Sequence, residues 1–312
     1  MKQYPQLSVV IPVYNEQESV GPLCERVRAA CDPLGVPYEL ILVDDGSKDG
    51  TFEKLEALHA QHDVVKVVKF RKNYGQTAAM AAGFRAARGR VVVSMDGDLQ
   101  NDPIDIPRLM AKLDEGYDVV CGWRKDRKDK LVSRKIPSRI ANWLIGRITG
   151  VPIHDNGCSL KAYRAEIIKN VALYSEMHRF IPAMSTLVGA RIAEIVVTHH
   201  ARQFGTSKYG IGRAWRVFLD LFLMKMLVGF VAQPVLWFFT ISIPTLLLGV
   251  ICMIPFLFLG MTSVVWPSMG FLCFAVVGHF ISMGIVGEMI LQTGNFEPGR
   301  LLARSMAKVS RC

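Results

Sequence analysis

The sequence predicts an α/β domain with a mostly parallel sheet, followed by two apolar helices that cross a membrane as a hairpin. Two observations support this fold class. From Leu7 to Met95, short β-branched runs alternate with helix-like stretches, which is the element order of a parallel sheet. Between Lys225 and Glu288, 62 consecutive residues include no Asp, Glu, Lys or Arg. A soluble domain and a membrane segment are therefore expected in one chain.

Four segments rich in Val, Ile and Leu end at residues typical of turns, so we interpret them as strands. These segments are Leu7 to Val13, Glu39 to Val43, Val64 to Phe70 and Arg90 to Met95. The intervening stretches predict helices over Glu18 to Cys31, Thr51 to Gln61 and Gln76 to Ala87. Ligands of such sheets bind beyond the carboxyl ends of the strands. The residues after each strand are therefore the candidate functional residues.

Composition and charge separate the two parts of the chain. With 312 residues, 51% of them hydrophobic and 21% charged, the chain is not disordered. Residues 1–225 carry 33 of the 37 Lys and Arg and 25 of the 27 Asp and Glu, so the soluble part is net positive. The seven cysteines have no metal-ligand or paired spacing. This usage suits a reducing compartment.

The uncharged run is long enough for two membrane-spanning helices. One span needs roughly 20 apolar residues, so we expect a hairpin over 229–294, with helices at about 231–258 and 266–291. The alternative is a buried helix pair in a soluble protein. Basic residues follow in the tail 295–312, and the turn between the helices is uncharged. The positive-inside rule therefore places both termini and the soluble domain in the cytoplasm.

Two segments are amphipathic, one within the predicted soluble domain and one directly before the hairpin. At about 135–148 and 211–228, apolar side chains recur at helical spacing opposite Arg, Lys and Asp. We expect both to lie in the headgroup layer of the membrane. The alternative is that each packs on the domain core. No cleavable signal precedes the first strand, so the layout predicts a catalytic domain over 1–210 that stays in the cytoplasm.

Acidic and polar residues follow the predicted strands and gather at one sheet edge. They are Pro12, Tyr14 and Glu16 after the first strand, Asp44 and Asp45 after the second, and Asp96, Asp98 and Gln100 after the fourth. Adjacent carboxylates repel unless a cation or hydrogen-bond donor shares the site. Mg²⁺ and Mn²⁺ prefer oxygen ligands, which Asp96, Asp98 and Gln100 can supply. Alternatively, an isolated Asp-x-Asp is a solvated turn. The absence of Gly-x-Gly-x-x-Gly after the first strand argues against a dinucleotide dehydrogenase.

Several motifs together resemble glycosyltransferase family 2, in the polyprenyl-phosphate branch that includes dolichol-phosphate mannose synthases and bactoprenol glucosyl- or aminoarabinosyltransferases. The motifs are IPVYNEQES (11–19), VDDGSKDGT (43–51), RKNYGQTAAMAAGF (71–84), MDGDLQNDP (95–103), DNGCSLKAYR (155–164), HRFIP (178–182), RQFGTSKY (202–209) and the terminal hairpin. The resemblance covers almost the whole chain. It implies a nucleotide-sugar domain of the GT-A type, a divalent metal, and sugar transfer with inversion to a lipid phosphate.

The resemblance also assigns roles to residues. Pro12, Tyr14 and Glu16 would border the nucleoside, Asp44 would meet the base or ribose, and Asp96, Asp98 and Gln100 would hold Mg²⁺ or Mn²⁺ against the diphosphate. Strand-end packing is the alternative for Pro12 and Tyr14, and turn formation is the alternative to ligand contact for Asn15 and Asp45. Two phosphates near one another require cations. The candidates for the acceptor phosphate are Arg124, Arg134, Ser138, Arg202 and Lys208, although each Arg can instead be an exposed surface charge.

Asp155 in the DNGC motif is expected to be catalytic together with Asp98. The resemblance implies either that it removes a proton or that it orients the acceptor or a cation. Some relatives carry the acid beyond the glycine, where this chain has Cys158, which we interpret as a packed residue rather than a nucleophile. His154 and His178 are either ligands and proton carriers or, as we favour, structural histidines with satisfied ring nitrogens.

The leading hypothesis is a hexosyltransferase of class EC 2.4. It would move a sugar from a UDP-linked donor such as UDP-glucose to undecaprenyl or dolichyl phosphate at a bacterial plasma membrane. The resemblance further implies a homo-oligomer, for which a tetramer is one possible state, and it implies no nucleic-acid partner. A processive polysaccharide synthase would need a Gln-x-x-Arg-Trp motif and more membrane helices, and the sequence contains neither. A third hypothesis is a membrane-anchored nucleotide-sugar binding protein without turnover.

Overall fold

The chain forms two compact units in a computed structural model. The first unit comprises Met1–Leu221 with Gly299–Cys312, and the second comprises Phe222–Pro298. The residues that the structure describes are 4–125, 146, 151, 153–171, 173, 177–186, 189–201, 230, 233–258 and 263–293. Among these residues, the first unit is α/β and the second consists of two long helices.

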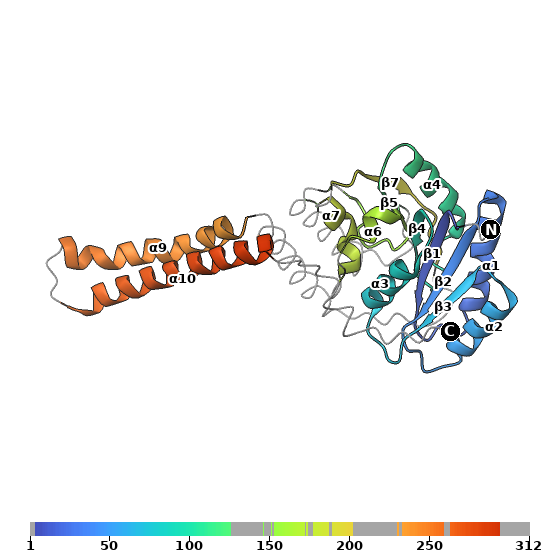
Figure 1. The fold of residues 1–312 in the computed structure, drawn as a ribbon, viewed down its shortest axis with the longest axis horizontal. Coiled ribbons are helices and arrows are strands. Elements are labelled where there is room, and N and C mark those ends of the chain that lie inside the picture. The colour runs from blue at the N-terminus through green and yellow to red at the C-terminus, as the bar shows by residue number, and fades with distance from the viewer. Residues whose placement is uncertain are drawn as a thin grey trace. The chain divides into compact units, whose positions relative to one another are not determined.

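A seven-stranded sheet of order β3-β2-β1-β4-β6-β5-β7 forms the centre of the first unit (Figure 1). Its strands are β1 (Leu7–Val13), β2 (Tyr38–Asp44), β3 (Val65–Lys69), β4 (Val91–Ser94), β5 (Val119–Trp123), β6 (Lys161–Arg164) and β7 (Ile192–Val196). Pairing is parallel throughout except for β6, which runs antiparallel to β4 and β5. The mostly parallel sheet is therefore confirmed, and three further strands extend it.

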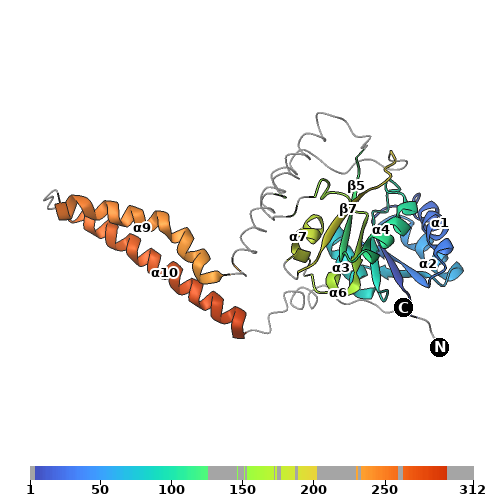
Figure 2. The same ribbon diagram turned by 90° about the horizontal axis from the view of Figure 1, so that it is seen from above.

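Helices cover both faces of this sheet. The elements are α1 (Val20–Cys31), η1 (Asp32–Leu34), α2 (Thr51–Gln61), α3 (Gln76–Ala86), η2 (Pro103–Asp105), α4 (Ile106–Asp114), α6 (Ala165–Ile168), η4 (Met177–Phe180) and α7 (Ile181–Thr186). In both ribbon views, α1, α2 and α4 lie on one face, and α3, α6 and α7 lie on the other (Figures 1 and 2). The unit thus has three layers, helix, sheet and helix, and this confirms the predicted α/β class.

β1 lies inside the sheet and is covered on both faces. All of its residues except Pro12 are buried, as expected for a strand whose two faces meet helices. A Cβ on Gly83 of α3 would lie 2.2 Å from Cγ1 of Val10, so the missing side chain lets α3 pack directly on β1. In register, Val13 at the end of β1 pairs with Asp44 at the end of β2. The carboxyl ends of both strands therefore meet at one edge.

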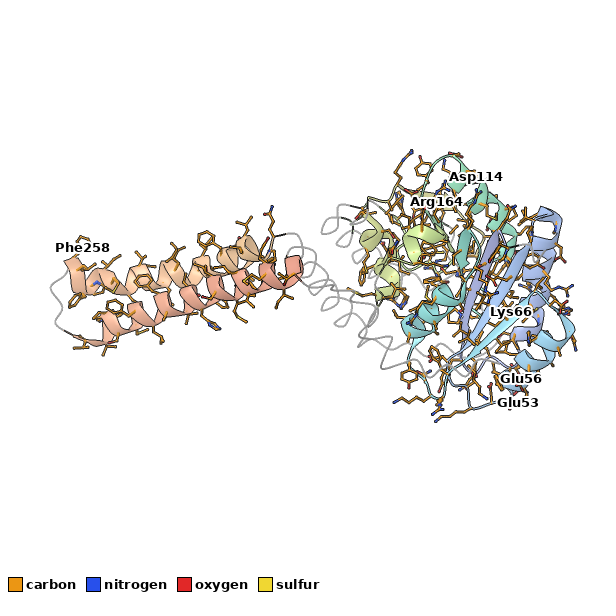
Figure 3. All side chains as sticks on the ribbon, viewed as in Figure 1. Glu53, Glu56, Lys66, Asp114, Arg164 and Phe258 are labelled. Carbon is orange, nitrogen blue, oxygen red and sulfur yellow. The ribbon has the colours of Figure 1, made fainter. Side chains whose placement is uncertain are left out.

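The second unit is a hairpin of α9 (Pro234–Phe258) and α10 (Val265–Thr293). Its surface is apolar: Phe258, labelled in Figure 3, is 79% exposed, and Leu248 and Phe271 are also exposed. Both helices are long and apolar enough to cross a membrane. An apolar surface of this extent needs an apolar environment, so the second unit is suited to association with a membrane.

Glycines bring the two hairpin helices close together. A Cβ on Gly249 of α9 would lie 3.0 Å from Cβ of Cys273 on α10, and one on Gly284 would lie 2.9 Å from the backbone Cα of Val235. Small residues at such contacts are typical of helices that pack within membranes, because they let the backbones approach. These contacts fix the register of α9 against α10.

We predict that a Gly249→Cys variant forms a disulfide with Cys273 in oxidised membranes. The two Cβ atoms lie 3.0 Å apart and need to separate by about 0.5 Å to enter the usual range of ~3.5–4.5 Å. Mass spectrometry of the digested full-length protein would detect the linked α9 and α10 peptides. Gly278→Cys is the control, because a Cβ there meets nothing within 4 Å. A linked peptide from Gly278→Cys but not from Gly249→Cys would show that the helix register is wrong.

Candidate active site

Asp44 ends β2 with a fully buried side chain. Its Oδ1 accepts the backbone N–H of Ser47 at 3.0 Å. Its Oδ2 is also buried and has no hydrogen-bond partner among the residues that the structure describes. Burying a carboxylate oxygen without a donor is costly, and such atoms are rare in folded proteins. Asp44 Oδ2 is therefore suited to accept a hydrogen bond from a bound ligand.

Side chains from neighbouring loops shape the backbone around Asp44. Asn15 adopts a left-handed conformation with φ of 52°. Its N–H donates to Ser47 Oγ and its Oδ1 accepts the N–H of Lys48, both at 2.9 Å. Asp45 accepts the N–H groups of residues 74–75 at 2.7 and 2.9 Å. Burial raises the pKa of Asp45, and these two hydrogen bonds offset part of that rise. The side chains of Asn15 and Asp45 therefore hold the backbone of these loops through hydrogen bonds, as the turn interpretation predicts.

The structure brings Pro12, Tyr14 and Glu16 to the same edge. Pro12 and Tyr14 are half-buried at and just beyond the end of β1. The carboxylate of Glu16 accepts the hydroxyl of Ser19 at 2.8 Å, directly before α1 begins. Val13 pairs with Asp44 in the sheet register, so these residues lie at or just beyond the strand end beside Asp44, where a nucleoside is expected.

Asp96 and Asp98 lie just beyond β4 and are half-buried. Asp96 Oδ1 accepts the side-chain amide of Gln76 at 2.6 Å, and Asp98 Oδ1 accepts the N–H of Gln100 at 3.2 Å. Leu99, which lies between Asp98 and Gln100, is fully buried and has a φ of 60°. Its buried side chain anchors a left-handed turn, so the packing of Leu99 holds Asp98 and Gln100 in place.

This turn has the oxygen chemistry that a divalent cation needs. A Cβ on Gly97 would lie 3.4 Å from the carbonyl oxygen of Pro12, so the acidic turn packs against the end of β1. No group of three His, Cys, Asp or Glu side chains able to hold a metal occurs within the described ranges. Mg²⁺ is commonly held by one or two carboxylates, with substrate phosphates completing its shell. Asp96, Asp98 and the Gln100 amide fit that arrangement.

Arg124 and Asp155 form a bidentate ion pair. Arg124 Nε donates to Asp155 Oδ2 at 2.7 Å, and Nη2 donates to Oδ1 at 2.9 Å. The two side chains are only 12% and 4% exposed. Burial lowers the pKa of Arg124, but the hydrogen bonds and charge of Asp155 outweigh it and hold that pKa above its usual value. The guanidinium therefore stays charged, and both carboxylate oxygens of Asp155 are occupied by it.

Arg124 lies between the acidic turn after β4 and the DNGC loop in its electrostatic contacts. The negative charge of Asp96 contributes to the raised pKa of Arg124, so the guanidinium lies within electrostatic reach of the acidic turn after β4. Gly157 leaves room for the ion pair, since a Cβ there would lie 3.3 Å from Arg124 Nη2. Asn101, just after the acidic turn, donates from Nδ2 to Ser159 Oγ at 2.8 Å, so the acidic turn and the DNGC loop are neighbours.

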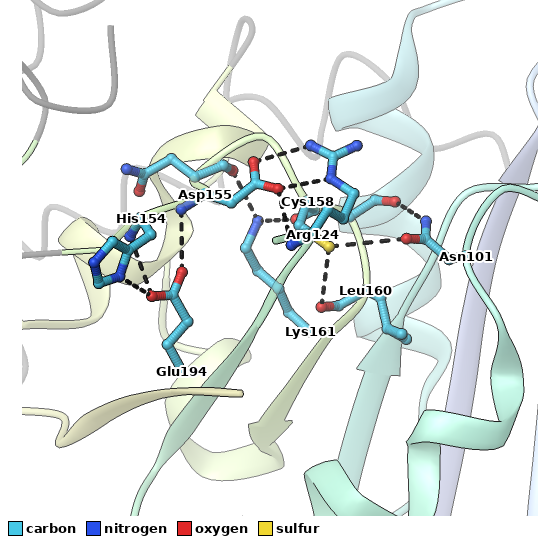
Figure 4. Close-up of polar contacts among 10 residues, drawn as sticks. Asn101, Arg124, His154, Asp155, Cys158, Leu160, Lys161 and Glu194 are labelled. Carbon is cyan, nitrogen blue, oxygen red and sulfur yellow. Dashed lines mark hydrogen bonds and ion pairs between the residues drawn. The ribbon is translucent and has the colours of Figure 1, made fainter. Parts of the chain in front are cut away.

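Strands β5, β6 and β7 together hold the DNGC loop (Figure 4). Arg124 directly follows β5. Lys161, which begins β6, is 3% exposed and donates from Nζ to the carbonyl oxygens of Asn156, at 3.1 Å, and Cys158. Glu194 in β7 accepts the N–H of Asp155 at 3.1 Å. Charged groups therefore fix both the side chain and the backbone of this loop.

The histidines and Cys158 have structural contacts. His178 is buried, its Nδ1 lies 2.7 Å from Thr77 Oγ1, and burial lowers its pKa to about 3, so it is neutral. His154 Nδ1 lies 2.7 Å from a Glu194 oxygen. Burial raises the pKa of the Cys158 thiol to about 11, which leaves it protonated and unreactive. The interpretation of both histidines as satisfied side chains agrees with these contacts.

Three residues that contact the candidate site were not predicted as site residues: Gln76, Lys161 and Glu194. Gln76 and Lys161 lie inside motifs that carry the family resemblance, and that was the only signal for them. Glu194 lies in a short strand outside every motif, and only the sheet pairing brings it to the loop. Four predicted acceptor residues lie outside the described ranges: Arg134, Ser138, Arg202 and Lys208. Both amphipathic segments, 135–148 and 211–228, are also outside them except for residue 146.

Comparison with known proteins agrees with this geometry. Residues 8–172 match the family described as Glycosyl transferase family 2. The chain is 47% identical over 301 residues to the dodecaprenyl-phosphate galacturonate synthase of Rhizobium johnstonii, covering 92% of this chain and 88% of the relative. It is 40% identical over 308 residues to the undecaprenyl-phosphate 4-deoxy-4-formamido-L-arabinose transferase of Klebsiella pneumoniae, covering 93% and 90%.

Solved structures share the fold at lower identity. Glucosyl-3-phosphoglycerate synthase from Mycobacterium tuberculosis, in complex with Mn²⁺, UDP and phosphoglyceric acid, matches with a TM-score of 0.56 and 19% identity over 71% of this chain and 78% of that one. The same enzyme with Mg²⁺ and UDP gives a TM-score of 0.54 and 20% identity over 71% and 79%. The first unit therefore has a GT-A-like fold. The chain belongs to glycosyltransferase family 2 and is a polyprenyl-phosphate glycosyltransferase of class EC 2.4.

Proposed function

We propose that this enzyme transfers a sugar with inversion from a nucleotide diphosphate to undecaprenyl or dolichyl phosphate at the cytoplasmic membrane face. The observation that carries the proposal is the shared edge: Asn101, just after the turn of Asp96 and Asp98, donates to Ser159 in the loop whose Asp155 pairs with Arg124. A donor diphosphate and an acceptor phosphate must come close for transfer to occur. This edge supplies a place for a cation on one side and a guanidinium on the other.

The nucleoside binds at the end of β1 and β2 in this proposal. Asp44 Oδ2 is buried without a partner among the described residues, and a ribose hydroxyl or a base N–H would supply the missing donor. Pro12, Tyr14 and Glu16 flank that position. The nucleotide is UDP, by resemblance to bacterial members with two terminal helices.

The diphosphate lies next to Asp96, Asp98 and Gln100. When Mg²⁺ or Mn²⁺ is bound there, it stabilises the negative charge that develops on the leaving diphosphate. The three residues hold the ion from the protein side, and the packing of Leu99 keeps their turn rigid. Two carboxylates facing a diphosphate without a cation would repel it.

The acceptor needs no proton acceptor from the protein. The second pKa of a phosphate monoester is about 6, so much of the lipid phosphate is already a dianion at neutral pH. Both oxygens of Asp155 accept hydrogen bonds from Arg124. Asp155 therefore orients Arg124, and Arg124 binds the acceptor phosphate with Arg134, Ser138, Arg202 and Lys208.

The membrane holds the lipid tail while the phosphate reaches this site. α9 and α10 anchor the chain, with both termini in the cytoplasm of a bacterial cell, and the segments 135–148 and 211–228 lie in the headgroup layer. Basic residues there favour anionic lipid. Assembly into a homo-oligomer such as a tetramer belongs to the same proposal and rests on the resemblance alone.

The direct test is transfer of labelled sugar into the organic phase by membranes that contain the full-length protein. UDP-galacturonate and UDP-4-deoxy-4-formamido-L-arabinose are the first donors to compare with UDP-glucose, because two relatives are named for those sugars. Lipid-linked label with one donor supports the proposal and identifies the sugar. Nucleotide binding without any lipid product supports a binding protein without turnover.

Asp98→Ala is predicted to abolish transfer and leave the protein folded and in the membrane. The variant removes one of two carboxylates available to the cation, so the diphosphate loses its charge stabilisation. The measurement is lipid-linked label with and without added Mg²⁺ or Mn²⁺, and a chelator should stop the parent enzyme as well. Full activity in Asp98→Ala would refute the metal assignment.

Asp44→Ala is predicted to weaken binding of the nucleotide about 10- to 100-fold. A hydrogen bond to a charged group contributes roughly 1.5–3 kcal/mol, and each 1.4 kcal/mol corresponds to a tenfold change in affinity. Calorimetric titration with UDP measures the change. Glu39→Gln is the matched control, since this buried carboxylate binds Ser8 and the N–H of Arg88 at the opposite end of β2. Equal loss in both variants would show a general effect on folding.

Asp155→Asn is predicted to raise KM for polyprenyl phosphate about 10- to 100-fold. An amide offers one oxygen, so Arg124 loses one of its two charged hydrogen bonds and its fixed orientation. Arg124→Lys should raise the same KM, because an ammonium cannot make the bidentate pair. Steady-state kinetics with varied lipid phosphate separates the alternatives. A fall in kcat with unchanged KM would instead identify Asp155 as a proton acceptor.

A further inference from the structure

Glu194 has an unusual set of partners beside the candidate active site. Its Oε1 accepts the backbone N–H of Asp155 at 3.1 Å, while Oε2 accepts the backbone N–H of His154 at 3.2 Å and contacts its ring Nδ1 at 2.7 Å. The Glu194 side chain is 13% exposed. Within the described ranges no Lys or Arg pairs with it. Its negative charge is therefore satisfied almost entirely by one dipeptide of the DNGC loop.

The sheet register explains why Glu194 reaches this dipeptide. β7 pairs with β5 in parallel, and Glu194 lies opposite Cys121, three residues before Arg124. One strand thus delivers the cation that binds the Asp155 carboxylate, and its neighbour delivers the anion that binds the Asp155 backbone. The ring of His154 stacks on Trp123 at 4.3 Å between ring centroids, with 16° between planes, and so locks the same dipeptide on its outer side.

These contacts matter for chemistry because Asp155 acts through Arg124. The direction of the Arg124 fork depends on where the Asp155 carboxylate lies, and that position depends on the backbone to which it is attached. Positioning errors of about 1 Å at a reacting centre can cost up to ~100-fold in rate. A fixed backbone at Asp155 is thus required for a fixed guanidinium at Arg124.

We propose that Glu194 is a positioning residue for the acceptor phosphate. It holds the backbone of His154 and Asp155 so that the Asp155–Arg124 pair faces the lipid phosphate in one orientation (Figure 4). This inference rests on the proposed function of Arg124. Glu194 itself contacts neither substrate and takes no part in proton transfer. Its role ends at the two N–H groups and the imidazole ring.

Glu194→Gln is the principal test. The amide –NH2 of Gln replaces one acceptor with a donor, so one of the two backbone N–H groups loses its partner. We expect kcat/KM for polyprenyl phosphate to fall about 10- to 100-fold, mainly through KM for the lipid, while UDP affinity stays within about twofold. In an Asp155→Asn background the same substitution should cause little further loss, since residues that act through one group are not additive.

Asp118→Asn is the matched control. Asp118 is also a partly buried carboxylate that accepts a backbone N–H, that of Arg191 directly before β7, at 2.8 Å, and it pairs with Arg164. It lies directly before β5, at the opposite end from Arg124. Asp118→Asn should leave KM for the lipid unchanged. Equal effects of the two variants, or full additivity of Glu194→Gln with Asp155→Asn, would overturn the proposal.

Backbone hydrogen exchange tests the positioning role without relying on transfer. In the full-length protein, amides of a peptide that spans 151–160 should exchange about tenfold faster in Glu194→Gln than in the parent or Asp118→Asn. Absence of that change sinks the inference even if the enzyme transfers sugar. If the parent protein has no transferase activity but Glu194→Gln still exchanges faster, the contact between Glu194 and the two N–H groups is supported and the proposed function is rejected. If Glu194→Gln fails to bind UDP, Glu194→Asp replaces it. The shorter carboxylate keeps the charge but cannot reach both N–H groups, so the same faster exchange is expected.

Discussion

The repulsion between negative charges at one sheet edge is the constraint on which the structure depends. The strands β2 and β4 lie on either side of β1 and run parallel to it. Asp44 at the end of β2 and the Asp96–Asp98 turn after β4 therefore lie around the end of β1. A substrate that carries a diphosphate, and another that carries a phosphate, must enter the same place. Cations and hydrogen-bond donors reconcile these charges. The fold supplies Arg124 in a buried ion pair, and in the proposed function a divalent ion would occupy the acidic turn.

Most of the proposed site for the nucleotide-sugar donor was predictable, because its residues follow the strand ends directly in the sequence. Candidate residues follow each strand end at once, so the positions of Asp44, Asp96 and Asp98 at this sheet edge could be predicted from the order of strands and helices. The acceptor half depends on long-range pairing. Arg124 and Asp155 are 31 residues apart, and Glu194 comes from a third strand. β5 (VVCGW) is apolar but short. β6 is shorter and includes Lys161 and Arg164, so no hydrophobic pattern marks β6 as a strand.

The loop around Asp155 illustrates how such a fold fixes one orientation for a charged side chain. Arg124 binds its carboxylate, Glu194 binds its backbone N–H, and Lys161 binds the carbonyl oxygens that follow. These contacts join three strands, so the loop cannot shift without breaking pairing that the sheet core maintains. An inverting transfer to a phosphate dianion needs orientation more than it needs a base, and the arrangement is consistent with that demand.

Asp96 and Asp98 would hold one divalent ion at the acidic turn, where it would offset the negative charge of the donor diphosphate. Electron–nuclear double resonance on Mn²⁺ in the full-length membrane protein, with and without UDP, tests this arrangement most directly. The account predicts a strong ³¹P coupling to bound Mn²⁺ when UDP is present, and its loss in Asp98→Ala. Mn²⁺ that shows no ³¹P coupling at saturating UDP, or coupling that survives in Asp98→Ala unchanged, would contradict it.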